Sequence, residues 1–155
     1  MERDFIIRRY RSEDVAQMAQ LFYDTVHTIN AKDYPRNQLK AWANGDIDLE
    51  LWNASFLAHY TVVAEKDGKI LGFADLVGTS YLDRLYVHKD HQAQGVATAL
   101  CEEIEAKAVG SVTTHTSLTA RTFFENRGYI LRKEQQVQKR GMWLTNLVME
   151  KPLNR

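Results

Sequence analysis

The sequence is poor in the features that mark several large classes of protein. It has one cysteine among 155 residues, so no disulfide can form within the chain, and this usage is typical of a reducing compartment. Its 20 basic and 20 acidic residues give a formal net charge of zero, so it lacks the basic excess that nucleic-acid binding requires. We therefore expect no nucleic-acid partner.

Long apolar segments are also missing. No run approaches the roughly 18 apolar residues that a membrane-spanning helix needs. Glu2 and Asp4 stand where a signal peptide carries basic residues, and no apolar segment follows them. We expect a cytoplasmic protein with no membrane partner.

What remains is the composition of one globular domain, which we expect to span residues 1–155 with 45% hydrophobic residues. Apolar periodicity and turn residues predict strands at 5–8, 60–64, 70–76, 81–87, 111–115, 129–137 and 142–151. Helices are predicted at 12–27, 35–44, 95–108 and 119–127, with a short piece at 49–52. This order predicts a mixed α/β (α+β) fold with a mostly antiparallel central sheet and helices on both faces.

Several residues mark where these elements begin and end. Ser12 is predicted to cap the first helix, and Pro35 to be the first residue of the second. Asp67 and Gly68 form a strong hairpin signal, and Gly128 is predicted to end the helix at 119–127 in the left-handed conformation.

A stretch with little side-chain bulk joins the strand at 81–87 to the next helix. Ala93, Gly95, Ala97 and Ala99 alternate along it, and Thr98 adds a hydroxyl. The free N–H groups of a first helical turn bind anions, and small residues let a phosphate approach them. The alternative is tight packing of helix on strand. A Walker A loop is excluded, because no Gly-Lys-Ser/Thr is present.

Two motifs occur in this order: Gln92-x-x-Gly95-x-Ala97, and Ala120-x-x-Phe123-Phe124-x-x-x-Gly128-Tyr129. They resemble the Q/R-x-x-G-x-G/A and A-x-x-F-Y-x-x-x-G-F motifs of the GNAT superfamily of N-acetyltransferases. The order of elements resembles that fold along essentially the whole chain. Residues 144–151 and 27–34 further resemble a branch of small bacterial acetyltransferases.

The resemblance implies acetyl-CoA as co-substrate, and the spacing of the possible ligands leads us to expect no metal. The resemblance also implies that the main chains of Leu85 and Val87 contact the pantetheine arm, and that residues 92–98 hold the pyrophosphate. The implied cofactor-binding residues are Leu85, Tyr86, Val87, Gln92, Gln94, Gly95, Val96, Ala97, Thr98, Ser117 and Phe124. For Ser117 the alternative is a helix cap or an ordinary loop residue.

Asp83 is the candidate general base, since an amine must lose a proton to attack a thioester. Strand alternation predicts that it shares a face with Tyr81, Leu85 and Val87. The alternative is an ion pair, with Arg84 or another basic residue. The resemblance assigns proton donation to the position of Phe124, which has no proton to give; Tyr81, Tyr129 or water are the substitutes.

Other polar residues are given structural interpretations. His88 and His91 lack further ligands at metal-binding spacing, and Cys101 within a helix is a poor nucleophile. His27 and His115 are possible site residues, and for each the favoured interpretation is a surface or hydrogen-bonded histidine. Tyr34 and Trp42 are candidates for substrate contact. The basic residues at 132–133 and 139–140 are interpreted as a solvated hairpin face.

The sequence therefore predicts an acetyl-CoA-dependent N-acetyltransferase that transfers acetyl directly to an amine of a small molecule or peptide. One alternative is a non-catalytic acyl-CoA-binding module, which the phenylalanine at 124 favours. Another is a nucleotide-phosphate binder without CoA chemistry. The last hairpin has edges that can pair, so a monomer and a homodimer both remain open.

Overall fold

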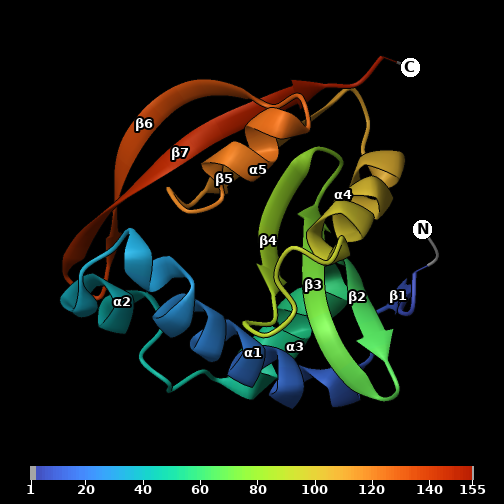
Figure 1. The fold of residues 1–155 in the computed structure, drawn as a ribbon, viewed down its shortest axis with the longest axis horizontal. Helices are drawn as coiled ribbons and strands as arrows, with labels where there is room; N and C mark the ends of the chain where they lie inside the picture. Colours follow the sequence, from blue (N-terminus) through green and yellow to red (C-terminus); the bar gives the residue numbers. More distant parts are fainter. Residues whose placement is uncertain (1–2, 155) are drawn as a thin grey trace.

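The strands form one sheet in which two neighbours near the centre run parallel. A computed structural model describes residues 3–154; Glu2, used above in the argument about a signal peptide, lies outside them. The sheet has seven strands in the order β1-β2-β3-β4-β5-β7-β6 (Figure 1). β4 and β5 are parallel, and the other neighbouring pairs are antiparallel. The predicted mixed, mostly antiparallel sheet is confirmed.

The elements follow one another in the predicted order. The strands are β1 (Ile6–Arg9), β2 (Tyr60–Lys66), β3 (Lys69–Val77), β4 (Tyr81–Val87), β5 (Ser111–Thr116), β6 (Ile130–Lys139) and β7 (Met142–Pro152). The helices are α1 (Val15–Thr28), α2 (Arg36–Trp42), α3 (Leu49–Ala58), α4 (Val96–Lys107) and α5 (Arg121–Asn126). α3 is longer than the piece predicted at 49–52, and α5 is shorter than the helix predicted at 119–127.

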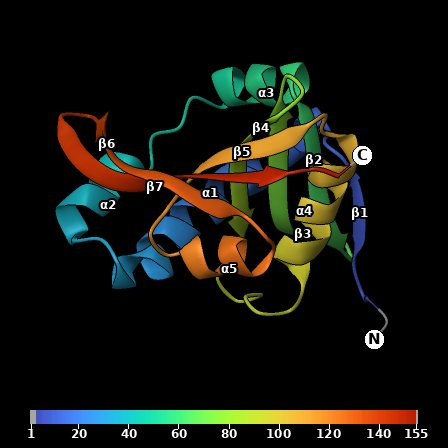
Figure 2. The ribbon, with the colours of Figure 1, turned by 90° about the horizontal axis from the view of Figure 1, so that it is seen from above.

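Helices cover both faces of the sheet. α4 and α5 pack on one face, in a core that includes Leu100 and Phe124. α1, α2 and α3 pack on the other, where Phe22 and Phe56 lie against the buried Phe73 of β3. The β6–β7 hairpin extends past the other strands, and its far end lies beside α2 (Figure 2). No helix within residues 3–154 is both long and apolar enough to cross a membrane.

The residues predicted to form turns and helix ends are confirmed in some cases and wrong in others. Asp67 and Gly68 form the predicted turn with φ of 50° and 81°, and Gly128 has φ of 93°. Ser12 does not cap α1; it lies in a 3₁₀ turn at Ser12–Asp14, where the Asp14 carboxylate accepts the Arg11 N–H at 2.8 Å. A buried carboxylate three residues into the turn thus replaces the predicted hydroxyl cap. Pro35 occupies the N-cap position of α2, one residue before the position that was predicted for it.

β4 contains one residue more than its partner β3. Arg84 pairs with Asp75, and Leu82 pairs with Leu76, so Asp83 is the extra residue of a β-bulge. A bulge shifts strand alternation by one position, so side chains beyond it point to the opposite face from the one that simple counting predicts.

The bulge corrects one prediction about the candidate base. Leu85 and Val87 pack into the core beneath α4. Asp83, before the shift, lies on the other face together with Tyr81, as predicted for that pair alone. The prediction that Asp83 shares a face with Leu85 and Val87 is therefore wrong.

Candidate active site

A groove of about 340 Å³ opens at the N-terminus of α4. Its lining includes most of the residues expected to bind cofactor: Leu85, Tyr86, Val87, Gln92, Gly95, Val96, Ala97, Thr98 and Ser117. The first bond of α4 runs from the Ala99 N–H to the Gly95 carbonyl at 3.0 Å, which leaves the N–H groups of residues 96–98 without helical partners. Because these donors lie at the positive end of the helix dipole, the groove is suited to an anion.

The loop before α4 is held by its own side chains. Gln92 Nε2 donates to the carbonyls of Val87 at 2.8 Å and His88 at 3.3 Å. Gly95 takes a φ of 85°, which favours glycine. Gln94 hydrogen-bonds His91 at 3.1 Å, and its side chain lies outside the groove lining. Gln92 therefore shapes the loop, and Gln94 does not contact the groove with its side chain.

α4 approaches the sheet closely at Gly72 of β3. A Cβ built there would lie 2.9 Å from Val96 Cγ1, 3.0 Å from the Tyr86 carbonyl oxygen and 3.1 Å from Leu100 Cδ1. A Cβ atom is essentially never found 2.9 Å from another heavy atom, so a larger residue would force the Val96 side chain, or the helix that carries it, to move. Because residue 72 has no side chain, α4 can pack close to β3, and this packing fixes where the first turn of α4 lies.

Beside the groove, the main chain of β4 turns away from β3. Val87 pairs with Gly72, and the next N–H, of His88, donates to the Leu71 carbonyl at 2.8 Å. In an antiparallel ladder, a hydrogen bond between these neighbours means that Val87 and Gly72 form a non-hydrogen-bonded pair. The N–H and C=O groups of Val87 therefore point away from β3. Those of Leu85, two residues earlier, point the same way.

These groups face a gap between β4 and β5. The register of the two strands ends at Leu82 and Thr114, so β4 continues without β5 beside it. The Val87 carbonyl already accepts the Thr25 hydroxyl at 2.9 Å, in addition to the loop glutamine. Leu85 therefore offers the more open main-chain groups for a ligand that enters this gap.

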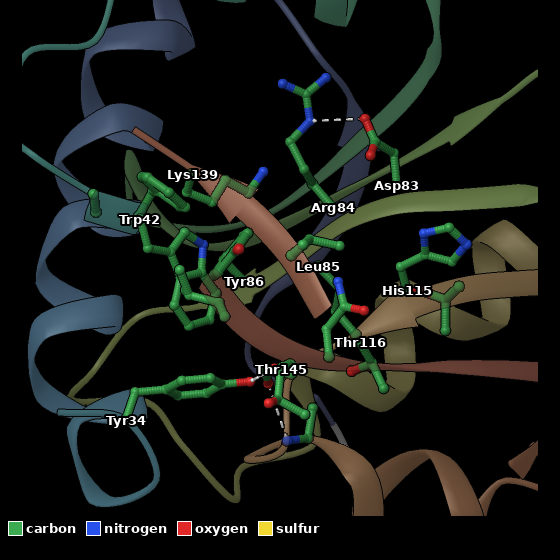
Figure 3. A pocket seen from close by; sticks show the side chains of 18 of the residues that line it. Tyr34, Trp42, Asp83, Arg84, Leu85, Tyr86, His115, Thr116, Lys139 and Thr145 are labelled. Atoms are coloured by element: carbon green, nitrogen blue, oxygen red, sulfur yellow. Dashed lines mark hydrogen bonds and ion pairs between the residues drawn. The ribbon is translucent and has the colours of Figure 1, made fainter. Parts of the chain in front are cut away.

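A larger cleft of about 670 Å³ lies on the other side of the gap (Figure 3). It shares Leu85, Tyr86, Ser117 and Ala120 with the groove, so the two cavities meet at these residues. Ser117 Oγ also accepts the Ala120 N–H at 3.2 Å and so supports the turn before α5. Both interpretations of that serine thus agree with the structure.

Asp83 lines the larger cleft. Its side chain is 35% exposed, and burial, together with the nearby Asp75 carboxylate, raises its pKa above the ordinary value. Arg84 Nε lies 3.6 Å from Asp83 Oδ2, but the guanidinium forms its main ion pair with the fully buried Asp75. The predicted contact with Arg84 exists and leaves Asp83 free to accept a proton from the cleft.

The same cluster offers three possible metal ligands, from His59, Asp75 and Asp83. The Arg84 guanidinium lies among them and donates to both oxygens of Asp75, while His59 Nδ1 hydrogen-bonds Asp75 at 2.8 Å. A cation already neutralises these ligands, so the cluster is an ion-pair network, and the donor set does not favour a metal ion.

The structure separates the candidates for proton donation. Phe124 lines the larger cleft and has no proton to give. Tyr129 is 3% exposed and donates to Glu105 Oε2 at 2.9 Å, so it is eliminated. Tyr81 lines the cleft, and burial and nearby carboxylates raise its pKa, so its hydroxyl keeps its proton at neutral pH. Cys101 is fully buried, and burial raises its pKa to about 12, in agreement with a thiol that does not react.

Comparison with known proteins assigns the family. The sequence model of the acetyltransferase (GNAT) domain matches residues 30–151. An uncharacterized N-acetyltransferase of Escherichia coli K12, YafP, is 32% identical over 143 residues, which cover 92% of this chain and 93% of that protein. The chain belongs to the GNAT family of N-acetyltransferases.

Solved structures agree with this assignment. A GCN5-related N-acetyltransferase from Rhodopseudomonas palustris has a TM-score of 0.92 and 32% identity, and the match covers 99% of this chain and 98% of that one. The Salmonella typhimurium acetyltransferase YncA, solved with acetyl-CoA, shares the GNAT fold at a TM-score of 0.73 and 18% identity, over 98% of this chain and 95% of that one.

The larger cleft of this GNAT protein includes residues of the β6–β7 hairpin tip that the sequence did not single out as a site. Lys139 and Arg140 are exposed, as expected of a solvated hairpin face, and they also line this cleft, which the sequence did not indicate. His115 also lines the cleft, whereas His27 hydrogen-bonds the Ala43 carbonyl at 2.6 Å, as expected of a structural histidine. No local signal marks these residues, because the long hairpin brings its tip to α2 only in the folded chain.

The residues proposed for substrate contact do lie at the larger cleft. Tyr34 and Trp42 both line it (Figure 3). The Tyr34 hydroxyl donates to the Thr145 carbonyl at 2.7 Å and accepts the Leu118 N–H at 3.0 Å. It thereby ties the segment between α1 and α2 to β7 and to the turn before α5.

Proposed function

We propose that this protein transfers an acetyl group from acetyl-CoA directly to an amine of a small molecule or peptide. The observation that carries the proposal is the meeting of the two cavities at Leu85, Tyr86, Ser117 and Ala120. One cavity presents backbone donors for an anion, and the other presents a carboxylate with a raised pKa.

The residues present fit acetyl-CoA. The N–H groups of Val96, Ala97 and Thr98 would hold the pyrophosphate, and Gly95 and Ala93 leave their approach open. The main chain of Leu85 would hydrogen-bond the pantetheine arm in the gap between β4 and β5. When bound, acetyl-CoA supplies the thioester carbonyl that the amine attacks.

In this mechanism, Asp83 accepts a proton from the amine, because an ammonium has no lone pair with which to attack. Its raised pKa makes it a better base than an ordinary aspartate. The amine nitrogen forms the new C–N bond as the C–S bond breaks. Tyr81 gives its hydroxyl proton to the departing thiolate and takes up in return the second proton of the amine nitrogen, which must leave for the neutral amide to form. Cys101 is too deeply buried to carry the acetyl group.

Two measurements test the function. Calorimetric titration with acetyl-CoA should show saturable binding, with ADP binding more weakly than CoA. A screen of amines that follows release of free CoA thiol should identify at least one acceptor whose acetylated product is confirmed by mass spectrometry. Binding without turnover on any amine would favour an acyl-CoA-binding module. ADP binding as tightly as CoA would favour a nucleotide-phosphate binder.

The location and assembly of the protein belong to the same proposal. A single buried thiol suits a reducing compartment, which supports a cytoplasmic location. β6 is an open edge of the sheet and leaves room for a second copy, so light scattering should distinguish a monomer from a homodimer.

A further inference from the structure

The larger cleft holds two exposed cations that form no ion pair with a carboxylate within residues 3–154. Lys139 and Arg140 line it, and neither has a carboxylate partner within residues 3–154. The Arg140 guanidinium donates to the carbonyls of Ala41 and Trp42, which fix its position but leave its charge uncompensated. The third cation of the cleft, Arg84, is by contrast neutralised by the buried Asp75.

These cations lie at the mouth of the cleft, where the tip of the β6–β7 hairpin meets α2. Figure 3 shows the Lys139 amine nitrogen extending from β6 toward the part of the cleft that holds Arg84 and Asp83. Lys139 is also near enough to Asp83 to lower its pKa slightly against the larger effect of burial. The cleft thus presents the Asp83 carboxylate, one unpaired cation (Lys139) within electrostatic reach of it, and a second unpaired cation, Arg140, in the same lining.

A second unpaired group lies in the same cleft. Asn146 of β7 lines it, and its Oδ1 is buried with no hydrogen-bond partner among the described residues. Buried acceptors are nearly always paired, so this oxygen calls for a donor from outside the chain. An amine has N–H groups for both the Asn146 oxygen and the Asp83 carboxylate.

The wall between these polar groups is apolar. Trp42, Trp52 and Tyr86 line the cleft together with Leu144. Such a wall favours an acceptor with an apolar body, and a volume of about 670 Å³ is within the usual range for small-molecule sites.

We infer that the acceptor is an amino acid: a small molecule whose amine is received by Asp83 and Asn146 and whose carboxylate is received by Lys139 and Arg140. The inference rests on the proposed acetyl transfer and goes beyond it, because nothing in the transfer chemistry itself requires a negative charge on the acceptor. The two unpaired cations favour an acceptor that carries a negative charge, and the unpaired Asn146 oxygen favours one that carries an N–H donor.

The first test compares matched acceptors that differ in the carboxylate alone. Phenylalanine, leucine and 6-aminohexanoate are compared with their methyl esters, with each rate expressed per free amine because esterification lowers the amine pKa. We expect kcat/KM for the best acid to exceed that of its ester by about tenfold, and this advantage to shrink as salt screens the charges. Equal rates, or faster rates with the esters, would overturn the inference.

The second test removes one cation. In Lys139→Met the KM for the acid should rise by about three- to tenfold, while the KM for the ester and the affinity for acetyl-CoA stay unchanged. Lys133→Met is the matched control, because that exposed lysine lies on the same strand outside the cleft. An equal rise for acid and ester in Lys139→Met would contradict a role in binding the carboxylate.

The third test concerns the other end of the acceptor. Asn146→Val removes a buried acceptor that has no partner, so thermal stability should be kept while the KM for both acid and ester rises. A loss of acetyl-CoA affinity instead would assign Asn146 to the cofactor and overturn its role here.

These results also separate this inference from the proposed function. If acetyl-CoA binds and no amine of either kind is acetylated, both fail together. If amines are acetylated without regard to the carboxylate, acetyl transfer stands and the acceptor class alone is wrong.

Discussion

At the scale of single residues, the chemistry of this site depends on how a bulge places Asp83. As the extra residue of β4, it leaves the face occupied by Leu85 and Val87 and lines the cleft beyond the gap. Arg84, its neighbour, is drawn to Asp75 through both its guanidinium and its backbone N–H, which donates to Asp75 Oδ1 at 2.9 Å. One buried aspartate thus stabilises the bulge and keeps the other available.

Asp83→Asn should lower turnover by about 10²- to 10⁴-fold, because the amide cannot accept the amine proton. The affinity for acetyl-CoA should stay unchanged, since Asp83 does not line the cofactor groove. Calorimetry and release of CoA thiol measure the two quantities. Asp67→Asn, in an exposed turn far from the cleft, is the matched control and should behave as wild type. Full activity in Asp83→Asn would eliminate that carboxylate as the base.

The pH dependence follows from the same carboxyl group. Because burial raises its pKa, the folded protein binds this proton more tightly than the unfolded chain, so ionised Asp83 costs stability above its folded pKa. Asp83→Asn should therefore unfold at the same temperature as wild type at pH 7, or at a higher one, and should lose the acid limb of kcat that wild type shows. A clear drop in the melting temperature of Asp83→Asn at pH 7 would contradict the claim that ionised Asp83 costs stability.

At the scale of elements, the position of α4 is set by close packing on β3. Gly72→Ala places a methyl group against Val96 and Leu100, and overpacking of this kind costs about 1–3 kcal/mol. It should also weaken acetyl-CoA binding, because the first turn of α4 moves with the helix. Chemical denaturation and calorimetry measure both effects.

The control for this substitution is Gly68→Ala. That glycine has a φ of 81° and no atom within 4 Å of an added Cβ, so alanine there is strained by about 1–2 kcal/mol without touching α4. It should lose stability and keep its affinity for acetyl-CoA. Equal loss of affinity in both variants would show that general destabilisation, and not helix position, governs binding.

Elements were predictable from sequence where the signal is local. The turn at Asp67 and Gly68 and the end of α5 at Gly128 follow from backbone conformation alone. The bulge at Asp83 was not predictable, because alternation carries no mark of an inserted residue. The cap at Asp14 was also missed, since its carboxylate is held by Arg8 through a contact that exists only after β1 and α1 meet.

At the scale of the whole molecule, a buried glutamate joins α4 to the segment between α5 and β6 and to β7. Glu105 accepts hydrogen bonds from Arg127, Tyr129 and Lys151, at distances of 2.6, 2.9 and 3.2 Å. Burial alone would raise the pKa of Glu105, but these hydrogen bonds together lower it. The carboxylate therefore stabilises the fold above its unfolded pKa, and this contribution is lost as pH falls through the folded pKa.

Glu105→Gln should lower the free energy of unfolding at pH 7 by about 2–3 kcal/mol, because it leaves two partly buried cations without their carboxylate. The difference from wild type should shrink under acid conditions. Glu103→Gln, on the exposed face of the same helix, should change little. Urea denaturation at pH 7 and pH 4 gives both values, and an equal effect of the two substitutions would contradict the account of Glu105.

Across the molecule, the cofactor half of the site was more predictable than the acceptor half. The small residues at 92–98 are contiguous and carry their own signal, and the structure places nearly all of them in one groove. The acceptor cleft is assembled from α1, α2, α3, β4, β5 and the distant hairpin. Lys139 and Asn146 enter it only through tertiary packing, so their residue types alone gave no indication of a site.

The most direct test of the central claim is an NMR titration that follows backbone amides as acetyl-CoA is added. The claim is that the first turn of α4 binds the pyrophosphate while the thioester reaches the junction near Leu85. It predicts saturable shifts that are largest for the amides of Gly95, Val96, Ala97 and Thr98, with a second group at Leu85 and Ser117. No saturable shift, or shifts confined to residues away from both cavities, would contradict it.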